Sequence, residues 1–403
     1  MAQGADFEKQ RAVAADGLRE GDPGGLKMRK FDFHPGGRVV FGEGALEQLG
    51  ALAQELGGER ILLVTDPGLV RAGLVEKAQH ALHKTSSTVV VFEGVEENPT
   101  SRHVEEGTAF ARAQGPIDLI VGLGGGSAMD CAKGINFLLT NGGVMEDYWG
   151  MDRATQPMLP SMGVPTTAGT GSEAQSFALI AQEKTHQKMA CGDQKARFRT
   201  VVLDPDLLGS APPQVVAAAG IDAISHALES YVTTKRNPLS QMYGREAWRL
   251  LEQGFAPLVD DPEHPQARGQ MLWGAHLAGA AIEASMLGAA HACANPLTAC
   301  YGVVHGVAVG LMLPHVIRFN SQAEEPLYAG LLPQSEGDCG ARLAARVEQL
   351  KQLAGLPERL RECSITEENL SALAGAAAAQ WTGKFNPRPV GEMELLQLYE
   401  AAY

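Results

Sequence analysis

Short apolar runs separated by amphipathic segments occupy the chain from about residue 37 to residue 205. Four of these runs are predicted to be strands: 38–41, 60–65, 88–92 and 117–122. The run at 60–65 has almost no polar alternation, which is typical of parallel strands buried on both faces. Three segments between the runs carry apolar residues at helical spacing: 45–56, 68–82 and 101–114. This alternation predicts an α/β region, with a parallel sheet and helices on both faces.

After residues 207–213 the pattern changes to segments rich in Ala and Leu. Apolar residues recur there three and four positions apart, as in 214–232, and no run beyond about residue 205 is typical of a strand. The second half is therefore predicted to be all α-helical. The predicted organisation is a flexible tail at 1–30, an α/β domain at 31–210 and a helical domain at 211–403.

Composition and charge exclude several classes of partner. The 403 residues include 33 basic and 47 acidic side chains, which give a net charge of −14. Nucleic acids and anionic membrane surfaces attract basic proteins, so neither is an expected partner. The most apolar stretch, 277–297, contains Glu283, His291 and Asn295. It is therefore predicted to be a buried helix of the helical domain, and not a membrane span.

The cysteines and the N-terminus indicate a cytoplasmic protein. None of the six cysteines forms a C-x-x-C pair, which argues against a zinc ribbon or a thioredoxin-type site. Six are too few for a disulfide scaffold in a chain of 403 residues, so free thiols are expected. Charged residues from Asp6 to Arg11 interrupt any secretory signal segment.

A glycine-rich loop follows the strand predicted at 117–122. Gly124, Gly125 and Gly126 precede Ser127 and a helical segment that continues to Leu139. A strand, a glycine turn and a helix in this order direct free backbone N–H groups at a phosphate, and the Ser127 hydroxyl adds a donor. The alternative interpretation is a tight turn between strand and helix.

Two further segments could contact the same ligand. Asp66 follows the strand at 60–65, where its carboxylate could bind a ribose hydroxyl or could cap the helix that begins at Pro67. The loop at 164–173 contains Thr166, Thr167 and Thr170. Their hydroxyl groups could bind phosphate, ribose or an amide.

One Asp and three His residues form a candidate metal set in the helical half. Asp222 and His226 are four residues apart on a predicted helix, so both project from one face. A simple hydrogen bond between them is the alternative to a metal. His291 and His305, in an otherwise apolar stretch, complete a set of three nitrogens and one oxygen. Such a set suits Fe²⁺ or Zn²⁺.

Four segments in this order resemble the motifs of the iron-containing (group III) alcohol dehydrogenase family: Gly124–Lys133, Pro165–Glu173, Gly220–Glu229 and His305–His315. The resemblance extends from about residue 31 to residue 403. It implies an N-terminal α/β nucleotide-binding domain, a C-terminal helical metal-binding domain and an active site in the cleft between them.

The resemblance also implies the site residues. It implies Asp222, His226, His291 and His305 as the ligands of Fe²⁺, with Zn²⁺ as the alternative ion. It implies NAD as the cofactor in preference to NADP. The implied cofactor contacts are Asp66, Gly124, Gly125, Gly126, Ser127, Asp130, Thr166, Thr167, Thr170, Leu179 and Lys188, with Leu179 near the nicotinamide.

One position departs from the family pattern. Many members carry a second His four residues after the third ligand, where this chain has Asn295. An amide cannot titrate, so a proton relay through this side chain is not expected. Water or the ribose hydroxyls of the cofactor are the alternative carriers.

These observations predict a metal-dependent, NAD-linked alcohol dehydrogenase or aldehyde reductase that transfers a hydride between a small metal-bound alcohol and nicotinamide. Two alternatives are a hydroxyacid–oxoacid transhydrogenase of the same family and a nucleotide-binding protein with impaired catalysis. Symmetric dimers are the commonest oligomers, so a homodimer is expected.

Overall fold

The computed structural model describes residues 36–403, apart from 86, 186, 324–325 and 333–337. The tail predicted at 1–30 lies outside these residues. Six strands form one sheet in the order β1-β9-β6-β4-β2-β3, and every neighbouring pair is parallel. The strands are β1 Arg38–Phe41, β2 Arg60–Val64, β3 Thr88–Phe92, β4 Leu119–Gly124, β6 Ser161–Pro165 and β9 Thr200–Leu203. The four predicted strands are confirmed, but β4 begins at Leu119 and not at Ile117.

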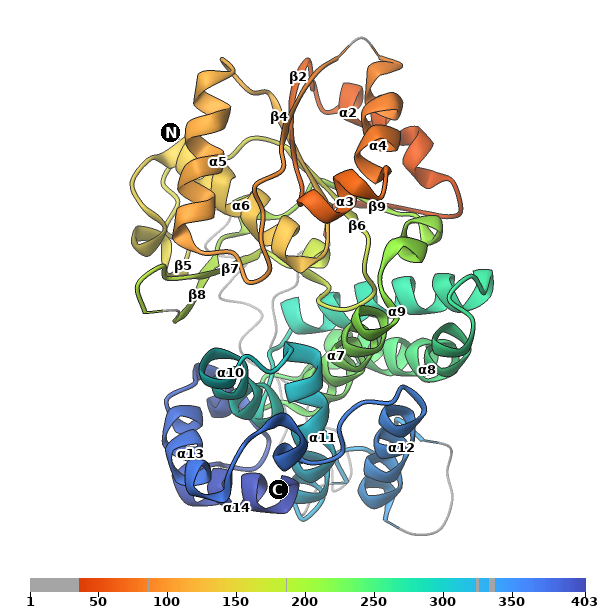
Figure 1. The fold of residues 1–403 in the computed structure, drawn as a ribbon, viewed down its shortest axis with the longest axis vertical. Helices are drawn as coiled ribbons and strands as arrows, with labels where there is room; N and C mark the ends of the chain where they lie inside the picture. The colour runs from red at the N-terminus through yellow and green to blue at the C-terminus, as the bar shows by residue number, and fades with distance from the viewer. Residues whose placement is uncertain (1–35, 86, 186, 324–325, 333–337) are drawn as a thin grey trace, which may run out of the picture. The chain divides into compact units, whose positions relative to one another are not determined.

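Alternate residues of the strands pack into separate cores on the two faces of this sheet. On β2, Ile61 and Leu63 belong to the core formed with α2 (Leu49–Glu55) and α4 (Leu74–His83). Leu62 and Val64 belong to the core formed with α5 (Ser101–Ala113) and α6 (Gly126–Asn141). Because successive side chains of a strand point to opposite faces, helices cover both faces, as predicted (Figure 1).

A second sheet was not expected from the sequence. It contains β5 (Gly150–Met151), β8 (Lys188–Gly192) and β7 (Phe177–Ala181), in that order. β7 and β8 are antiparallel, and β5 pairs with β8 in parallel. The three strands are too short to produce a clear period in the sequence. This sheet positions Leu179 and Lys188, two of the predicted site residues.

The chain from Pro213 onward is helical, and its described residues contain no strand. The helix predicted at 214–232 is confirmed as α7 (Figure 1). The helices of this half are α7 Pro213–Val232, α8 Pro238–Asp260, α9 Pro265–Glu283, α10 Ala289–Tyr301, α11 His305–Asn320, α12 Cys339–Leu353, α13 Leu370–Ala378 and α14 Glu392–Ala402. The contacts among α7, α8 and α9 form the largest part of its core.

The apolar stretch 277–297 is buried as predicted, but it is not one helix. α9 ends at Glu283, and α10 begins at Ala289. The Asn386 side chain accepts a hydrogen bond of 3.2 Å from the Ala289 N–H, and Glu229 accepts one of 2.7 Å from the Ala290 N–H. These acceptors satisfy the free N–H groups of a new helix start, which hydrophobic patterning does not reveal.

The helix predicted at 68–82 is also divided. It forms α3 (Pro67–Arg71) and α4, with Gly73 between them. Gly73 has a φ of 72°, a left-handed conformation that ends α3 and that glycine adopts without strain.

The structure agrees with two expectations from the sequence: free cysteines and no membrane-spanning helix among the described residues. All six cysteines are free, and Cys131, Cys191 and Cys293 are buried. Among the residues that the structure describes, no helix combines the length and the apolar character needed to cross a membrane.

Helices α7 and α11 touch backbone to backbone at Gly306. A Cβ atom at this position would lie 2.6 Å from the carbonyl carbon of Ala218. Only glycine therefore permits this approach, which brings His305, the first residue of α11, close to α7.

We expect Gly306→Ala to lower the free energy of unfolding by about 1–3 kcal/mol, because the added methyl group forces α11 away from α7. Gly375→Ala in α13 is the matched control, since its Cβ would lie 3.7 Å from its nearest neighbour, Glu392. Alanine there should raise stability by up to about 1 kcal/mol. Denaturant unfolding of both variants measures the difference, and equal stabilities would contradict the expectation.

Candidate metal centre and cofactor site

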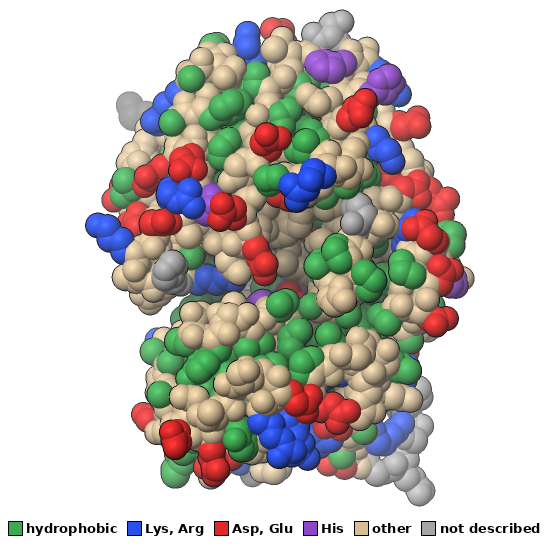
Figure 2. All heavy atoms as spheres, in the orientation of Figure 1, with side chains coloured by type: hydrophobic (Ala, Val, Ile, Leu, Met, Phe, Trp, Pro, Cys, Tyr) green, Lys and Arg blue, Asp and Glu red, His purple; other side chains and the backbone are tan. Residues whose placement is uncertain are grey.

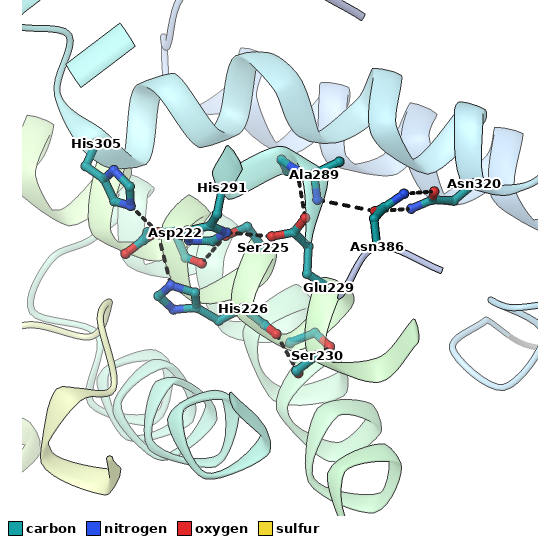
Figure 3. A network of polar contacts seen from close by, with 12 residues as sticks. Asp222, Ser225, His226, Glu229, Ser230, Ala289, His291, His305, Asn320 and Asn386 are labelled. Carbon is teal, nitrogen blue, oxygen red and sulfur yellow. Dashed lines mark hydrogen bonds and ion pairs between the residues drawn. The ribbon is translucent and has the colours of Figure 1, made fainter. Parts of the chain in front are cut away.

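Four predicted metal ligands from three helices meet in the helical half (Figure 3). The Oδ1 atom of Asp222 lies 3.4 Å from His226 Nε2, 3.6 Å from His291 Nε2 and 3.9 Å from His305 Nε2. The His226 and His291 rings stack with their centroids 4.9 Å apart. The candidate ligand atoms of Asp222, His226 and His291 all lie within 4.8 Å of one another, whereas His305 stands at the edge of this group.

Two atoms at the centre of this group have no hydrogen-bond partner. Asp222 Oδ1 and His291 Nε2 are both fully buried and unpaired. An unpaired carboxylate oxygen in the protein interior is costly unless a positive charge compensates it. A divalent cation held between these atoms would satisfy both, so the donor set fits a metal ion.

Two of the three imidazoles are neutral, and the third carries a proton that a bound cation would replace. Burial lowers the pKa of His226, and it lowers the pKa of His305 to about 3, so both rings are neutral near pH 7 and offer lone pairs. Burial opposes the charge on His291 as well, but the Asp222 and Glu229 carboxylates raise its pKa to about 9. The centre of the group therefore favours positive charge.

Glu229 fixes the orientation of His291. His291 Nδ1 donates a hydrogen bond of 2.6 Å to Glu229 Oε2 (Figure 3). This bond leaves Nε2 directed at Asp222, the arrangement in which a second carboxylate orients a metal-ligating imidazole. The sequence analysis gave Glu229 no role. Its position on α7, three residues after His226 and on the same helix face, is the signal that could have indicated one.

The glycine loop lies at the carboxyl end of β4. Gly124 is the last residue of β4 and has a φ of 149°, and α6 begins at Gly126 without any side-chain cap. The free N–H groups of the first turn of α6 therefore remain available to an anion. The Ser127 side chain lies in this same turn and is half-buried.

Asp66 caps α3 and also faces the glycine loop. Its Oδ1 atom accepts hydrogen bonds from Gly68 N–H at 2.8 Å and Leu69 N–H at 3.1 Å, so it caps α3. Its Oδ2 atom lies beside the glycine loop, 3.5 Å from the position of a Cβ atom on Gly124. The carboxylate thus has one oxygen for the cap and one directed toward the loop.

The loop at 164–173, called the threonine loop below, contacts the glycine loop at 124–126. Thr166 N–H donates to the Gly124 carbonyl at 2.9 Å, and Thr167 and Thr170 lie against Gly125 and Gly126. An apolar pocket opens beside them, between this loop, the segment before α7, and α7 to α9. Its lining residues are Thr166, Thr167, Ala168, Leu208, Ala211, Val215, Val216, Ala219, Leu258 and Met271.

Asp130, Leu179 and Lys188 complete the predicted cofactor contacts. Asp130 is buried in α6, and its Oδ1 atom accepts a hydrogen bond of 2.6 Å from Ser172 Oγ. Leu179 and Lys188 are half-buried on β7 and β8. Burial lowers the pKa of Lys188, while Asp130 and Asp222 oppose this shift. The Asp130 and Asp222 carboxylates thus favour the charged form of Lys188.

Lys133 was not predicted as a site residue. Its ammonium group is fully buried and donates to the Ser172 carbonyl at 2.7 Å, to Ser172 Oγ at 2.9 Å and to the Phe177 carbonyl at 2.6 Å. These bonds tie α6 to the end of the threonine loop and to the start of β7. A lysine inside an otherwise apolar helix was the signal available in the sequence.

Asn295 lies one helical turn after His291 on α10. Its Nδ2 group donates a hydrogen bond of 3.1 Å to Gln380 Oε1. The position next to the candidate metal ligands therefore holds a neutral amide that is hydrogen-bonded to the segment preceding Trp381.

Figure 2 shows the surface hollowed between the two halves of the chain, with a histidine side chain visible inside the hollow.

Comparison with known proteins assigns the family. The family model "Iron-containing alcohol dehydrogenase" matches residues 36–205, and the model "Fe-containing alcohol dehydrogenase family, C-terminal" matches residues 216–403. Alcohol dehydrogenase 4 of Schizosaccharomyces pombe is 34% identical over 373 residues, which cover 90% of this chain and 87% of that protein.

Solved structures show the same fold. A 1,3-propanediol oxidoreductase superposes with a TM-score of 0.89 at 33% identity, over 93% of this chain and all of the other. The sulfoacetaldehyde reductase of Bifidobacterium kashiwanohense, solved in complex with NAD⁺, has a TM-score of 0.84 at 26% identity, over 93% of this chain and 99% of the other. The predicted α/β and all-α architecture is thereby confirmed. The chain belongs to the iron-containing alcohol dehydrogenase family, as an alcohol dehydrogenase or aldehyde reductase.

Proposed function

We propose that this chain interconverts a small alcohol and its aldehyde with NAD, at a divalent cation held by Asp222, His226, His291 and His305. The observation that carries the proposal is the buried, unpaired Oδ1 atom of Asp222 among three imidazole rings. The family favours Fe²⁺ as the cation, and Zn²⁺ suits the same ligands.

The bound groups supply the reactive chemistry: the cation polarises the substrate oxygen as a Lewis acid, and nicotinamide exchanges a hydride with the carbon. The protein orients these groups. Glu229 holds the His291 ring in place, and the contact of Gly306 with Ala218 keeps His305 within reach of Asp222. Buried apolar residues around α7 and α10 limit the access of water to the ligand group.

The cofactor contacts are proposed from the loops that surround the start of α6. The free N–H groups of Gly126 and Ser127 would bind the pyrophosphate, with the Thr166 and Thr167 hydroxyls nearby. Lys188 and Leu179, on β8 and β7, and Asp130, on α6, are proposed to lie on the nicotinamide side.

The choice of NAD over NADP is proposed to depend on Asp66. Its Oδ2 atom beside the glycine loop can accept a hydrogen bond from a ribose 2′-hydroxyl. The same negative charge would repel a 2′-phosphate.

The proton released from the alcohol is proposed to leave by a route that does not pass through Asn295. Its amide has no titratable proton, and it already donates to Gln380. Water or the ribose hydroxyls of the cofactor would carry the proton instead.

The remaining assignments from the sequence stay predictions. The division into domains at 31–210 and 211–403 is supported by the two family models, which match the two halves separately. The homodimer and the cytoplasmic location rest on the sequence arguments alone.

Metal removal tests the proposed function. We expect chelation to abolish NAD reduction by short alcohols and Fe²⁺ to restore it, with Zn²⁺ tested in parallel, because the ligands require a cation to act on the substrate. Absorbance at the nicotinamide band measures turnover, and atomic absorption measures the bound metal.

His291→Ala is the matching variant in this experiment. It should lose activity and most of the bound metal, because His291 is a proposed ligand beside Asp222. It should retain NADH binding, because His291 is not among the proposed cofactor contacts. Normal turnover in this variant would refute the ligand assignment. Exchange between a hydroxyacid and an oxoacid without free NAD would favour the transhydrogenase alternative, and metal and NADH binding without turnover would favour the non-catalytic one.

Asp66→Ala should relax the choice of cofactor. Without the carboxylate, the ratio of kcat/KM for NAD to that for NADP should fall by about tenfold or more, which corresponds to roughly 1.4 kcal/mol. Asp66→Asn is the conservative comparison, because an amide oxygen retains the cap on α3 but removes the charge. A ratio unchanged in both variants would exclude the ribose contact.

Glu229→Gln should weaken metal binding by about 10–100-fold, because the His291 ring loses its charged hydrogen-bond partner. Glu252→Gln in α8 is the control, since Glu252 pairs with Arg346 of α12 at 2.7 Å and neither helix carries a proposed ligand. Titration of the apoprotein with Fe²⁺ measures both affinities. Equal affinities would mean that Glu229 does not support the metal ligand.

A further inference from the structure

The segment from Thr170 to Phe177 contacts both halves of the chain. On one side it meets α6, where Lys133 binds Ser172 and the Phe177 carbonyl, and Asp130 accepts from Ser172 Oγ. The Thr170 side chain lies directly against Gly126, with 2.6 Å between its Cγ2 atom and the position of a Cβ atom on that glycine. This side of the segment is therefore fixed to the glycine loop.

On its other side the same segment meets one face of α9. His276 Nδ1 lies 3.1 Å from Glu173 Oε1, and Glu283 accepts hydrogen bonds from Ser176 N–H at 2.9 Å and Ser176 Oγ at 3.1 Å. Residues 276, 279 and 283 recur at helical spacing and thus share one face of α9. Gly279, between the two polar contacts, is where the backbones of helix and segment touch.

The contact at Gly279 leaves no room for a side chain. A Cβ atom at Gly171 would lie 2.6 Å from the Gly279 Cα atom, and one at Gly279 would lie 2.8 Å from the Gly171 Cα atom. Gly171 has a φ of 61°, so it is also the residue that suits this left-handed position. The separation between α9 and the segment is therefore set by backbone contact.

Glu283 is saturated with partners from the α/β half. Besides Ser176, its Oε1 atom accepts a hydrogen bond of 2.8 Å from Gln194, and Arg197 Nη1 lies 3.9 Å away. A carboxylate at the C-terminus of a helix is unfavourable for the helix dipole, and Glu283 is the last residue of α9. Its position is thus explained by its partners outside the helix.

The segment 170–177 contacts the proposed cofactor site, and α9 packs against the helix that carries two of the proposed metal ligands. In the segment, Thr170 contacts Gly126 of the glycine loop. Ser172 is hydrogen-bonded to Asp130 and Lys133 of α6, the helix that follows this loop. α9 packs extensively against α7, which carries Asp222 and His226, and the chain continues from α9 into α10, which carries His291. Any change in how α9 contacts the segment therefore changes the separation between the cofactor loops and the metal ligands.

We propose that α9 and the segment 170–177 form a clamp between the two halves, in which Gly279 and Glu283 are positioning residues for hydride transfer. The proposal rests on the proposed function. It adds two residues outside the proposed cofactor contacts and metal ligands, and these residues contact Gly171 and Ser176. Because a displacement of about 1 Å can reduce a rate by about 10²-fold, a small shift at this contact is sufficient to slow the reaction.

The test uses paired variants in the metal-loaded, full-length chain. Gly279→Ala forces α9 away from the segment, whereas Gly269→Ala on the same helix places its Cβ 3.6 Å from Phe41, an ordinary contact. Glu283→Ala removes the bonds to Ser176, and Glu283→Gln retains an oxygen that can accept them. For each variant we would measure bound Fe²⁺, the NADH dissociation constant, kcat, the effect of α-deuterated alcohol and hydrogen exchange of the segment 170–177.

We expect Gly279→Ala and Glu283→Ala to reduce kcat by about 10–100-fold, with bound Fe²⁺ and the NADH dissociation constant within about threefold of the parent. The deuterium effect on kcat should rise, because hydride transfer becomes slower than the other steps. Hydrogen exchange of the segment should increase. Gly269→Ala should match the parent, and Glu283→Gln should recover most of kcat.

Two results would overturn the clamp. One is a kcat at the parent level in both Gly279→Ala and Glu283→Ala. The other is a loss of kcat that follows a parallel loss of Fe²⁺ or NADH binding, which indicates general destabilisation. Failure of the proposed function is distinguishable, because the parent enzyme itself would then not reduce NAD. If Gly279→Ala does not fold, the two Glu283 variants decide the matter alone.

Discussion

A carboxylate oxygen without a hydrogen bond, buried among three imidazole rings, is the constraint around which the helical half is organised. Asp222 Oδ1 would be costly to bury unless a positive charge compensates it. Meeting that requirement needs helices α7, α10 and α11 to converge, although residues 222, 291 and 305 are far apart in the chain. The fold achieves this by starting a new helix at Ala289, where Glu229 accepts a hydrogen bond from the Ala290 N–H, and by bringing α11 against α7 at Gly306.

The α/β half imposes a different constraint. In a parallel sheet the carboxyl ends of the strands lie at one edge, so the loops that follow β2, β4 and β6 become neighbours. Asp66, Gly124 and Thr166 come together for this reason, although they lie at the ends of three different strands. The hydrogen bond from Thr166 N–H to the Gly124 carbonyl directly links two of these loops.

Periodicity and motif spacing revealed the parts of the molecule that depend on local sequence. Four strands of the large sheet and α7 follow from apolar patterns, whereas β6 and β9 were not predicted. The i, i+4 spacing of Asp222 and His226 indicated the face of the candidate ligands. Features that depend on distant partners were missed. The break between α9 and α10 is stabilised by Glu229 and Asn386, Glu229 finds its role only beside His291, and β7 is recognisable only through its pairing with β8. Apolar patterns contain no information about such contacts.

The buried ammonium of Lys133 has a consequence for the energetics of dinucleotide binding. Its three hydrogen bonds hold α6 against the end of the threonine loop and the start of β7 without any contribution from a ligand. The surface that would receive the pyrophosphate is thus already ordered before the dinucleotide arrives. A preorganised surface loses little conformational entropy when the ligand binds, so more of the interaction energy appears as affinity.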